Sequence, residues 1–389
     1  MTSENKEIAG NWNYPTQVRF GAGRINELVE VCQFSGLENP LLVTDSGLAD
    51  LPMLKQVLKQ CENAGLQLAV FKDVKSNPTG ENVREGLAVY KMGKHDGVIA
   101  FGGGSSLDAG KAIAVIAGQN HDLWDFEDED DNWLRVNANI VPPIIAVPTT
   151  AGTGSEVGRA SVIHDVDAEK KKIIFHPKML PHVVIADPEL TLGLNAKITA
   201  ATGMDALSHN LEAYCAPGYH PMADGIAVEG IRLIKDNLIT AVQSGNNIAA
   251  RSHMLAASMM GATAFQKGLG AMHALAHPLG ALYDTHHGLL NAVLMPYVLL
   301  HNRPAIESRI CRLAKYIELE DVSFDGFMQW VLELRKVIGI PHCLSDIGIN
   351  TARRDEISRM ALADPSNSGN PRNMTIEAYQ SILEHAYKV

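Results

Sequence analysis

The sequence predicts an α/β domain with a mostly parallel sheet, followed by an all-α domain. In the first half, short apolar runs alternate with amphipathic segments, a pattern typical of β-α-β units whose sheet is covered on both faces. From about Asp187 onward, apolar residues recur with helical spacing and β-branched runs are few. We therefore expect an α/β domain over residues 1–187 and a helical domain over residues 188–389, with a ligand cleft between them.

The elements of both halves follow from the same patterns. In the first half, apolar runs predict strands at 40–45, 66–71, 96–101 and 144–148. Amphipathic segments between them predict helices at 51–65, 82–92 and 106–117. In the second half we expect helices at 197–214, 223–244, 247–267, 271–283 and 286–302, and several more toward residue 389. The acidic stretch 125–132 lacks the glycine of a calcium loop and is interpreted as a solvated loop.

Composition and charge exclude several classes of protein. The chain has 389 residues, of which 46% are hydrophobic and 20% charged, so wholesale disorder is not expected. The formal net charge of −11 argues against nucleic acid or an anionic membrane as the main partner. Five scattered cysteines without a C-x-x-C motif favour a reducing compartment. The opening residues lack the apolar core of a signal peptide, and no apolar run is long enough for a membrane span. We therefore expect a cytoplasmic protein.

A glycine-rich turn joins a predicted strand to a predicted helix within residues 97–108. Its core reads G-G-G-S-S-L-D. Glycines allow a ligand to approach the backbone closely, and the free N–H groups and dipole of the following helix favour an anion such as pyrophosphate. The turn matches neither a Walker A loop nor G-x-G-x-x-G, so a tight connection without a ligand is the alternative.

Two further features support a dinucleotide. Asp45 ends an earlier predicted strand, where a carboxylate can accept from ribose hydroxyls and repel a 2′-phosphate; a helix N-cap is the alternative. The loop P-T-T-A-G-T-G-S-E at 148–156 has four hydroxyls and two glycines after a strand. It offers several donors to a ligand, and an ordinary polar loop is the alternative.

Acidic and imidazole side chains gather in the predicted helices. Asp205 and His209 are four residues apart, as are His273 and His277, so each pair shares one helix face. His287 follows nearby. Hydrogen-bonded core histidines are the alternative, but burying such groups unpaired would cost several kcal/mol each. One aspartate and three histidines around a divalent metal remove that cost and leave a coordination position open. H-E-x-x-H is absent, so a zincin protease is not indicated.

These motifs resemble the iron-containing (group III) alcohol dehydrogenases. The resemblance rests on G-G-G-S-S-L-D, P-T-T-A-G-T-G-S-E, A-A-T-G-M-D-A-L-S-H and G-A-M-H-A-L-A-H-P-L-G-A. It extends from the R-F-G at Arg19 to the G-N-P-R ending at Arg372. It implies the two-domain architecture that this family shares with dehydroquinate synthase.

The resemblance also implies the roles of individual residues. The implied metal ligands are Asp205, His209, His273 and His287. The implied cofactor contacts are Asp45, Asn77, Gly103, Gly104, Ser105, Asp108, Thr149, Thr150, Thr153 and Lys172. His277 corresponds to the histidine beside the metal and is the candidate catalytic proton relay. Arg159 stands where relatives often carry other residues, and Arg159 and Phe265 are the candidate substrate contacts. For Arg159 a solvated or structural role is the alternative.

The function implied is reversible hydride transfer between a primary alcohol or aldehyde and NAD, with NADP less favoured. Fe(II) is the expected metal, and Zn(II) is also compatible with nitrogen and oxygen ligands. The family implies a homodimer or a larger homo-oligomer. One alternative is a hydroxy-acid or semialdehyde dehydrogenase, for example for 4-hydroxybutyrate, with Arg159 binding the carboxylate. Others are a lyase of the dehydroquinate synthase type and a non-catalytic nucleotide sensor.

Overall fold

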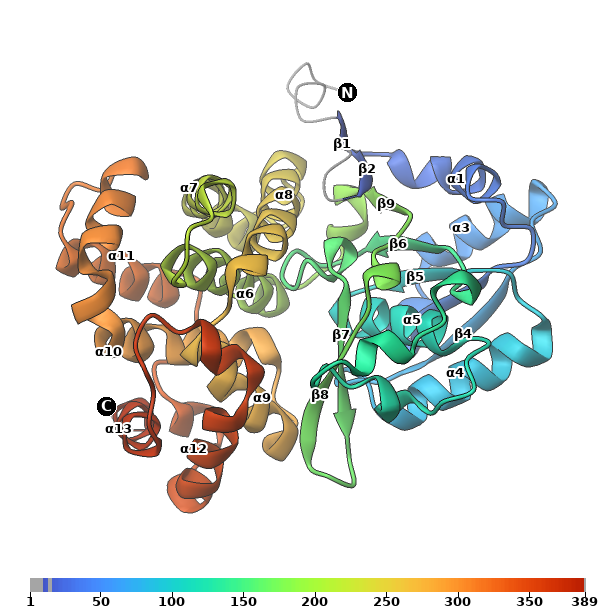
Figure 1. The fold of residues 1–389 in the computed structure, drawn as a ribbon. Coiled ribbons are helices and arrows are strands. Elements are labelled where there is room, and N and C mark those ends of the chain that lie inside the picture. The colour runs from blue at the N-terminus through green and yellow to red at the C-terminus, as the bar shows by residue number, and fades with distance from the viewer. Residues whose placement is uncertain (1–9, 13–15, 388–389) are drawn as a thin grey trace. The chain divides into compact units, whose positions relative to one another are not determined.

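The computed structural model describes residues 10–12 and 16–387. The opening residues 1–9, which bear on the prediction about a signal peptide, lie outside the described residues. The described chain divides into two compact units (Figure 1). Unit 1 extends to Leu192, and unit 2 begins at Gly193 and also includes Ala151–Thr153. Among the described residues, no helix combines the length and apolar character needed to cross a membrane.

The helical turn Pro188–Thr191 lies in unit 1, although it follows the boundary that the sequence predicts after Asp187. The Asp187 carboxylate accepts a hydrogen bond of 2.9 Å from the backbone N–H of Ile25 and caps this turn. Both contacts tie the turn to unit 1. The domain boundary between residues 187 and 188 stays a prediction from the change in composition there.

Unit 1 contains a seven-stranded sheet in the order β1-β2-β9-β6-β5-β3-β4. All neighbouring pairs are parallel except β1 with β2. This confirms the predicted mostly parallel sheet. The strands are β1 Gly10–Trp12, β2 Gln17–Phe20, β3 Leu41–Asp45, β4 Ala69–Val74, β5 Val98–Gly102, β6 Ile144–Pro148 and β9 Val183–Ala186.

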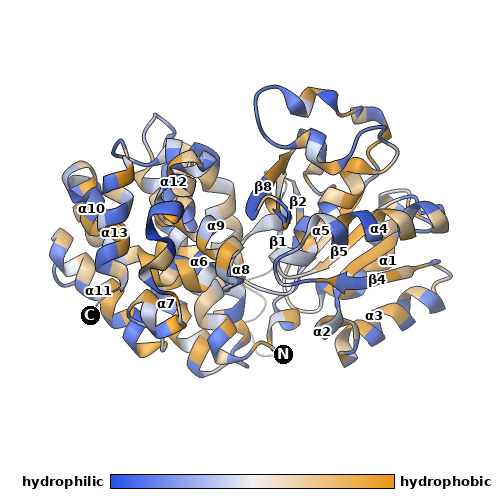
Figure 2. Cartoon of the chain, turned by 90° about the horizontal axis from the view of Figure 1, so that it is seen from below, coloured by the Kyte–Doolittle hydropathy of each residue, from blue (hydrophilic) through white to orange (hydrophobic). Residues whose placement is uncertain are grey.

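Both faces of this sheet are buried, which is why its strands are continuous apolar runs. In β3, Leu41 and Val43 face one hydrophobic cluster, which includes helix α5 (Gly104–Ile116). Leu42 faces a second cluster, which includes helices α1 (Leu28–Phe34) and α3 (Pro52–Asn63). Figure 2 shows strands coloured as hydrophobic beside helices that alternate polar and apolar stripes. The helices of unit 1 are α1 Leu28–Phe34, α2 Ser46–Ala49, α3 Pro52–Asn63, α4 Gly80–Gly93 and α5 Gly104–Ile116.

A separate antiparallel hairpin, which the sequence analysis did not predict, follows the sheet strand β6. It consists of β7 Ala160–Asp165 and β8 Lys170–Phe175. In β7 every second residue is buried, as expected for a strand with one covered face. The acidic stretch before it begins within a short 3-10 turn, Leu123–Phe126, whose Leu123 and Phe126 are buried.

Unit 2 is helical, as predicted. Its helices are α6 Ala196–Cys215, α7 Pro221–Gln243, α8 Ile248–Ala264, α9 Ala271–Tyr283, α10 His287–Tyr316, α11 Phe324–Val337, α12 Arg354–Ala363 and α13 Ile376–Tyr387. Helix α6 is buried over most of its length because its faces carry small residues such as Ala206 and Ser208. It is the central helix of the unit and supplies the site described next.

Candidate functional site

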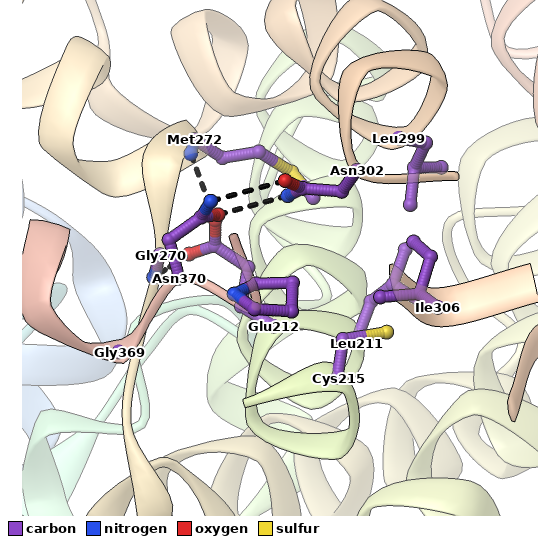
Figure 3. A pocket seen from close by; sticks show the side chains of 11 residues that line it. Leu211, Glu212, Cys215, Gly270, Met272, Leu299, Asn302, Ile306, Gly369 and Asn370 are labelled. Atoms are coloured by element: carbon purple, nitrogen blue, oxygen red, sulfur yellow. Dashed lines mark hydrogen bonds between the residues drawn. The ribbon is translucent and has the colours of Figure 1, made fainter. Parts of the chain in front are cut away.

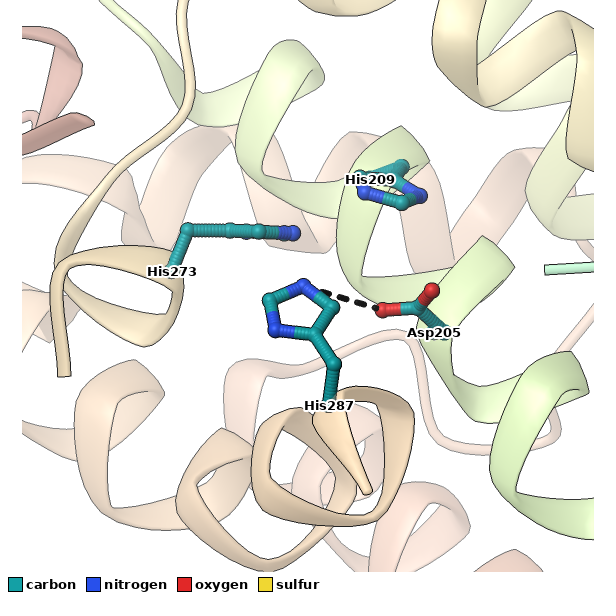
Figure 4. A group of neighbouring side chains, drawn as sticks. All are labelled: Asp205, His209, His273 and His287. Atoms are coloured by element: carbon teal, nitrogen blue, oxygen red, sulfur yellow. Dashed lines mark ion pairs between the residues drawn. The ribbon is translucent and has the colours of Figure 1, made fainter. Parts of the chain in front are cut away.

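Four side chains of unit 2 converge on one point. Asp205, His209, His273 and His287 each offer one nitrogen or oxygen atom, and these atoms all lie within 4.8 Å of one another (Figure 4). Asp205 and His209 come from α6, His273 from α9 and His287 from the first turn of α10. The first three are at most 3% exposed. Three helices thus bring one carboxylate and three imidazoles to a single buried position.

A glycine allows two of these helices to meet. Gly288 follows His287, and a Cβ at this position would lie 2.5 Å from the Ala201 carbonyl oxygen and 2.9 Å from the Asp205 Cβ. Any side chain would therefore push α10 away from α6. Glycine keeps the helices close enough for His287 Nε2 to lie 3.8 Å from Asp205 Oδ1. The local sequence thus explains why a ligand from α10 reaches α6.

Hydrogen bonds orient the imidazoles toward the shared point. His273 Nδ1 donates to Glu212 Oε2 at 2.7 Å, so its Nε2 carries a lone pair rather than a proton. His209 Nδ1 lies 3.2 Å from the Gly152 carbonyl oxygen, which is an acceptor only, so His209 also keeps its Nε2 lone pair. Burial lowers the pKa of His209 to about 4, so that this ring is neutral near pH 7.

The arrangement fits one divalent cation. A carboxylate and three imidazoles with lone pairs directed to one buried point repel one another unless a positive charge lies between them. Nitrogen and oxygen donors of this kind suit Fe(II), Zn(II) and similar first-row ions. The residues therefore have the chemistry and the proximity that a metal site requires.

Glu212 was not among the residues that the sequence analysis selected. It lies in α6, three residues after His209, and its two oxygens accept from His273 Nδ1 and from the backbone N–H groups of Gly270 and Met272. Figure 3 shows Glu212 beside Gly270 and Met272 in a small pocket that also includes Asn302 and Asn370. The only sequence signal was its spacing of seven from Asp205, which places both on one helix face.

His277 lies beside the cluster. Its ring stacks on His287 with centroids 5.4 Å apart and an interplanar angle of 14°. Its Nδ1 is 2.8 Å from Asp364 Oδ2. Burial would raise the pKa of Asp364, but the His277 contact and bonds from Ser366 hold it below its usual value. Phe265, the other expected residue here, packs its ring 5.3 Å from that of His209.

In unit 1, most expected cofactor residues gather where parallel strands end. Asp45, the glycine turn and Thr150 follow β3, β5 and β6, whose carboxyl ends lie along one edge of the sheet. The backbone N–H of Thr149 donates to Gly102 at 2.9 Å, and a Cβ at Gly103 would lie 3.3 Å from Thr150 Cγ2. This edge of a parallel sheet is where such folds bind ligands.

The glycine turn also contacts the segment that contains Asn77. Gly103 caps α5, which begins at Gly104, and Ser105 Oγ donates to the carbonyl of Ser76. Asp45 accepts from the N–H of Leu48 at 3.0 Å and lies 3.5 Å from Ser106 Oγ. It is therefore a helix N-cap whose carboxylate also faces the glycine turn. The remaining expected residue, Thr153, belongs to unit 2 with the rest of Ala151–Thr153.

Two expected cofactor contacts have other partners. Asp108 Oδ1 accepts from Ser155 Oγ, and its Oδ2 accepts from the N–H of Val162 at 2.9 Å. The buried ammonium of Lys111 lies 3.3 Å away. The oxygens of Asp108 thus hold the β7 segment against α5, and a cofactor role for this residue stays a prediction.

Lys172 is the second. It pairs with Glu127 at 3.0 Å and with Asp165 at 3.1 Å, and its ammonium lies 5.0 Å from the centre of the Trp124 ring. Its neighbour Lys171 instead donates to Asn77 Oδ1 at 2.9 Å. Successive residues of a strand point to opposite faces. The lysine that contacts Asn77, an expected cofactor residue, is thus Lys171, and the cofactor role of Lys172 stays a prediction.

Arg159 is exposed, and its guanidinium lies 5.7 Å from the centre of the Phe175 ring across the hairpin. This contact favours a structural role for Arg159, which is the alternative to a substrate contact. Its carbonyl oxygen accepts from the N–H of His176 at 3.2 Å, which fixes the backbone at the start of β7.

Comparison with known proteins finds a family match for each half of the chain. Residues 15–188 match the family model described as "Iron-containing alcohol dehydrogenase", and residues 199–387 match "Fe-containing alcohol dehydrogenase family, C-terminal". The chain is 38% identical to 4-hydroxybutyrate dehydrogenase of Cupriavidus necator, over 96% of this chain and 98% of that protein. It is 33% identical to the NAD-dependent methanol dehydrogenase of Bacillus methanolicus, over 97% and 99% of the two chains. A crystal structure of 1,3-propanediol oxidoreductase superposes with a TM-score of 0.90 at 37% identity, covering 97% of this chain and 99% of that one.

Proposed function

The chain belongs to the iron-containing alcohol dehydrogenase family, and we propose that it interconverts a primary alcohol and its aldehyde with NAD and an iron(II) ion. The observation that carries this proposal is the convergence of Asp205 and three histidines on one buried point. We assign these four residues as the metal ligands. A bound divalent cation supplies Lewis acidity that favours loss of the alcohol proton, while nicotinamide accepts the hydride.

The chain's own residues hold the ion, the dinucleotide and a proton. For the dinucleotide we propose Asn77, Gly103, Gly104, Ser105, Thr149, Thr150 and Thr153, and Lys171 in addition to the predicted Lys172 and Asp108. Asp45 favours NAD over NADP because its carboxylate would repel a 2′-phosphate. His277 is the proposed proton relay: Asp364 holds the Nδ1 proton, and Nε2 is left to exchange one.

A substrate screen with NADH absorbance as the readout tests this function. We expect metal-reconstituted protein, purified without oxygen, to reduce NAD with short primary alcohols such as butanol and 1,3-propanediol. NADP should serve less well. A protein that consumes substrate with no net change in NADH would be a lyase, and one that binds nucleotide without a divalent metal would be a sensor.

Replacement of His277 by alanine is expected to reduce turnover by about 100-fold or more, because general acid–base groups contribute at least that much. Metal content, measured by elemental analysis, should stay at the wild-type level because the four proposed ligands are intact. Asp364→Asn keeps the imidazole but replaces the charged acceptor of its Nδ1 proton by a neutral amide oxygen, and it should lower turnover less. Full activity in His277→Ala would remove this histidine from the mechanism.

A second candidate substrate is a hydroxy acid. The relative from Cupriavidus necator is named for 4-hydroxybutyrate, and Arg159 is an exposed cation suited to a carboxylate. If this arginine binds the acid, Arg159→Ala should raise KM for 4-hydroxybutyrate about two- to fivefold, as expected for an exposed ion pair, and leave butanol kinetics unchanged. Equal effects on the charged and the neutral substrate would show that Arg159 acts only through its contact with Phe175.

We also propose that the enzyme acts in the cytoplasm as a homodimer or larger homo-oligomer. All five cysteines lie in the described part of the chain, and none forms a disulfide. This supports a reducing compartment. Light scattering after size-exclusion chromatography measures the assembly directly.

A further inference from the structure

Asn291 contacts three of the four proposed metal ligands. It lies in α10, one helical turn after His287, and is 0% exposed. Its Nδ2 lies 2.9 Å from Asp205 Oδ1, 3.2 Å from His273 Nε2 and 3.2 Å from His287 Nε2. The side-chain amide therefore faces the same point as the ligand atoms.

The two ends of this amide differ in their hydrogen-bond partners. Nδ2 carries two hydrogens but lies within hydrogen-bond distance of three polar atoms, while the buried Oδ1 has no hydrogen-bond partner among the described residues. His273 Nε2 is an acceptor because its Nδ1 proton is donated to Glu212. In this orientation the Nδ2 hydrogens of Asn291 point at Asp205 Oδ1 and His273 Nε2, whose lone pairs a cation would need.

A cation reverses the electrostatics of this amide. N–H groups directed at a positive ion are repelled, whereas an amide oxygen is an ordinary ligand for divalent ions. Rotation of the amide exchanges two groups of almost equal size, and Oδ1 gives up no hydrogen bond in the rotation. The same side chain can thus face the ligand cluster with either end.

We propose that Asn291 is a fifth member of the metal site, whose amide turns to present Oδ1 to the bound ion. The inference rests on the proposed function, because it requires a divalent cation at Asp205, His209, His273 and His287. If instead Nδ2 keeps its bond to Asp205 and Asn291 only positions that carboxylate, the number of groups around the ion does not depend on residue 291.

Cobalt(II) as the probe ion separates these cases. Asn291→Leu matches the amide in branching and in the number of side-chain heavy atoms, removes its oxygen and, because methyl groups are larger, leaves little room for a water in its place. We expect this variant to bind Co(II) at least tenfold more weakly in competition with a chelator. Its visible absorption bands should also become more intense, because the loss of one ligand brings the ion closer to tetrahedral geometry. Asn291→Asp supplies an oxygen again and should bind Co(II) at least as tightly as the wild type.

Asn210→Leu is the matched control. Asn210 follows His209 in α6 and, like Asn291, is 0% exposed. Its Nδ2 donates to the carbonyls of Ala206 and Ala257 rather than to the proposed ligands. Circular dichroism and thermal unfolding report whether each variant folds. The control should lose stability and keep the wild-type affinity and spectrum of Co(II).

The outcomes distinguish a failure of the proposed metal site from a failure of the fifth ligand. Wild-type protein that binds no Co(II) would overturn the proposed metal site and the fifth ligand together. If Asn291→Leu bound Co(II) with the same affinity and the same spectrum as the wild type, the fifth ligand alone would be overturned. Weaker binding by Asn291→Asp than by Asn291→Leu would also overturn it, because an oxygen at this position would then harm the site.

Discussion

Replacement of Asp205 by asparagine is expected to abolish tight metal binding and alcohol oxidation without unfolding the protein. Asp205 is 3% exposed and is the only carboxylate among the four proposed ligands. Asparagine keeps its shape but cannot supply the negative charge that a divalent ion requires. In the presence of a chelator the variant should be at least as stable as the wild type, because it removes a buried charge.

Thermal unfolding with and without added Fe(II) or Zn(II) measures both parts of this expectation. At a metal concentration a hundredfold above Kd, the wild type gains about 2.7 kcal/mol of stability, and Asp205→Asn should gain none. Asp364→Asn is the control, since Asp364 is another carboxylate of unit 2, its side chain is only 8% exposed, and it pairs with His277 rather than with a proposed ligand. A variant at Asp205 that held metal with wild-type affinity would refute the four-ligand assignment.

The α/β half of the fold could be predicted because local pattern and tertiary packing agree there. Strands buried on both faces must be continuously apolar, and β3, β5 and β6 are such runs. The hairpin β7–β8 was missed because Lys170, Lys171 and Lys172 begin one of its strands and look like a solvated charge run. Two of their partners, Glu127 and Asn77, are distant in sequence, and Asp165 comes close to Lys172 only once the hairpin has formed.

Helix lengths in the second half were predicted less well where proline occurs. The expected helix at 286–302 ends before Pro304, yet α10 continues to Tyr316 through both Pro296 and Pro304. Each proline removes one backbone hydrogen bond and strains the helix. Packing of α10 along α6, α9 and α11 offsets this local cost, and local propensity contains no information about such packing.

The candidate site also has features that the sequence predicts and features that depend on packing. The i, i+4 spacing of Asp205 with His209 is a local property, so their common face follows from the sequence. The sequence could not indicate that Gly288 lets α10 approach α6, or that Asn291 lies among the ligands. Glutamate and asparagine are common residues in helices, and their roles depend on neighbours that the fold brings together. Lys171 and Lys172 show why strands are sensitive to register: they are neighbours in sequence, but they point to opposite faces and have different partners.

Glu212→Gln is expected to weaken metal binding by 10- to 100-fold and to reduce turnover in parallel. The carboxylate of Glu212 accepts from three N–H groups, including His273 Nδ1 at 2.7 Å (Figure 3). Glutamine has one acceptor oxygen, so its NH2 group must face at least one of these donors. If it faces His273, the imidazole proton moves to Nε2, the atom that the ion needs. Chelator competition on the purified variant measures the loss of affinity.

The reason for expecting a large effect is that Glu212 fixes a tautomer and a backbone turn together. Its bonds to Gly270 and Met272 hold the start of α9, so the variant should also lose about 1–3 kcal/mol of stability. Glu156→Gln is the matched control, because Glu156 is equally buried but hydrogen-bonds none of the proposed ligands. It should leave metal affinity unchanged. If Glu212→Gln lost stability but bound metal as tightly as the wild type, Glu212 would support the turn only, and the orientation of His273 would have to come from its packing against His209.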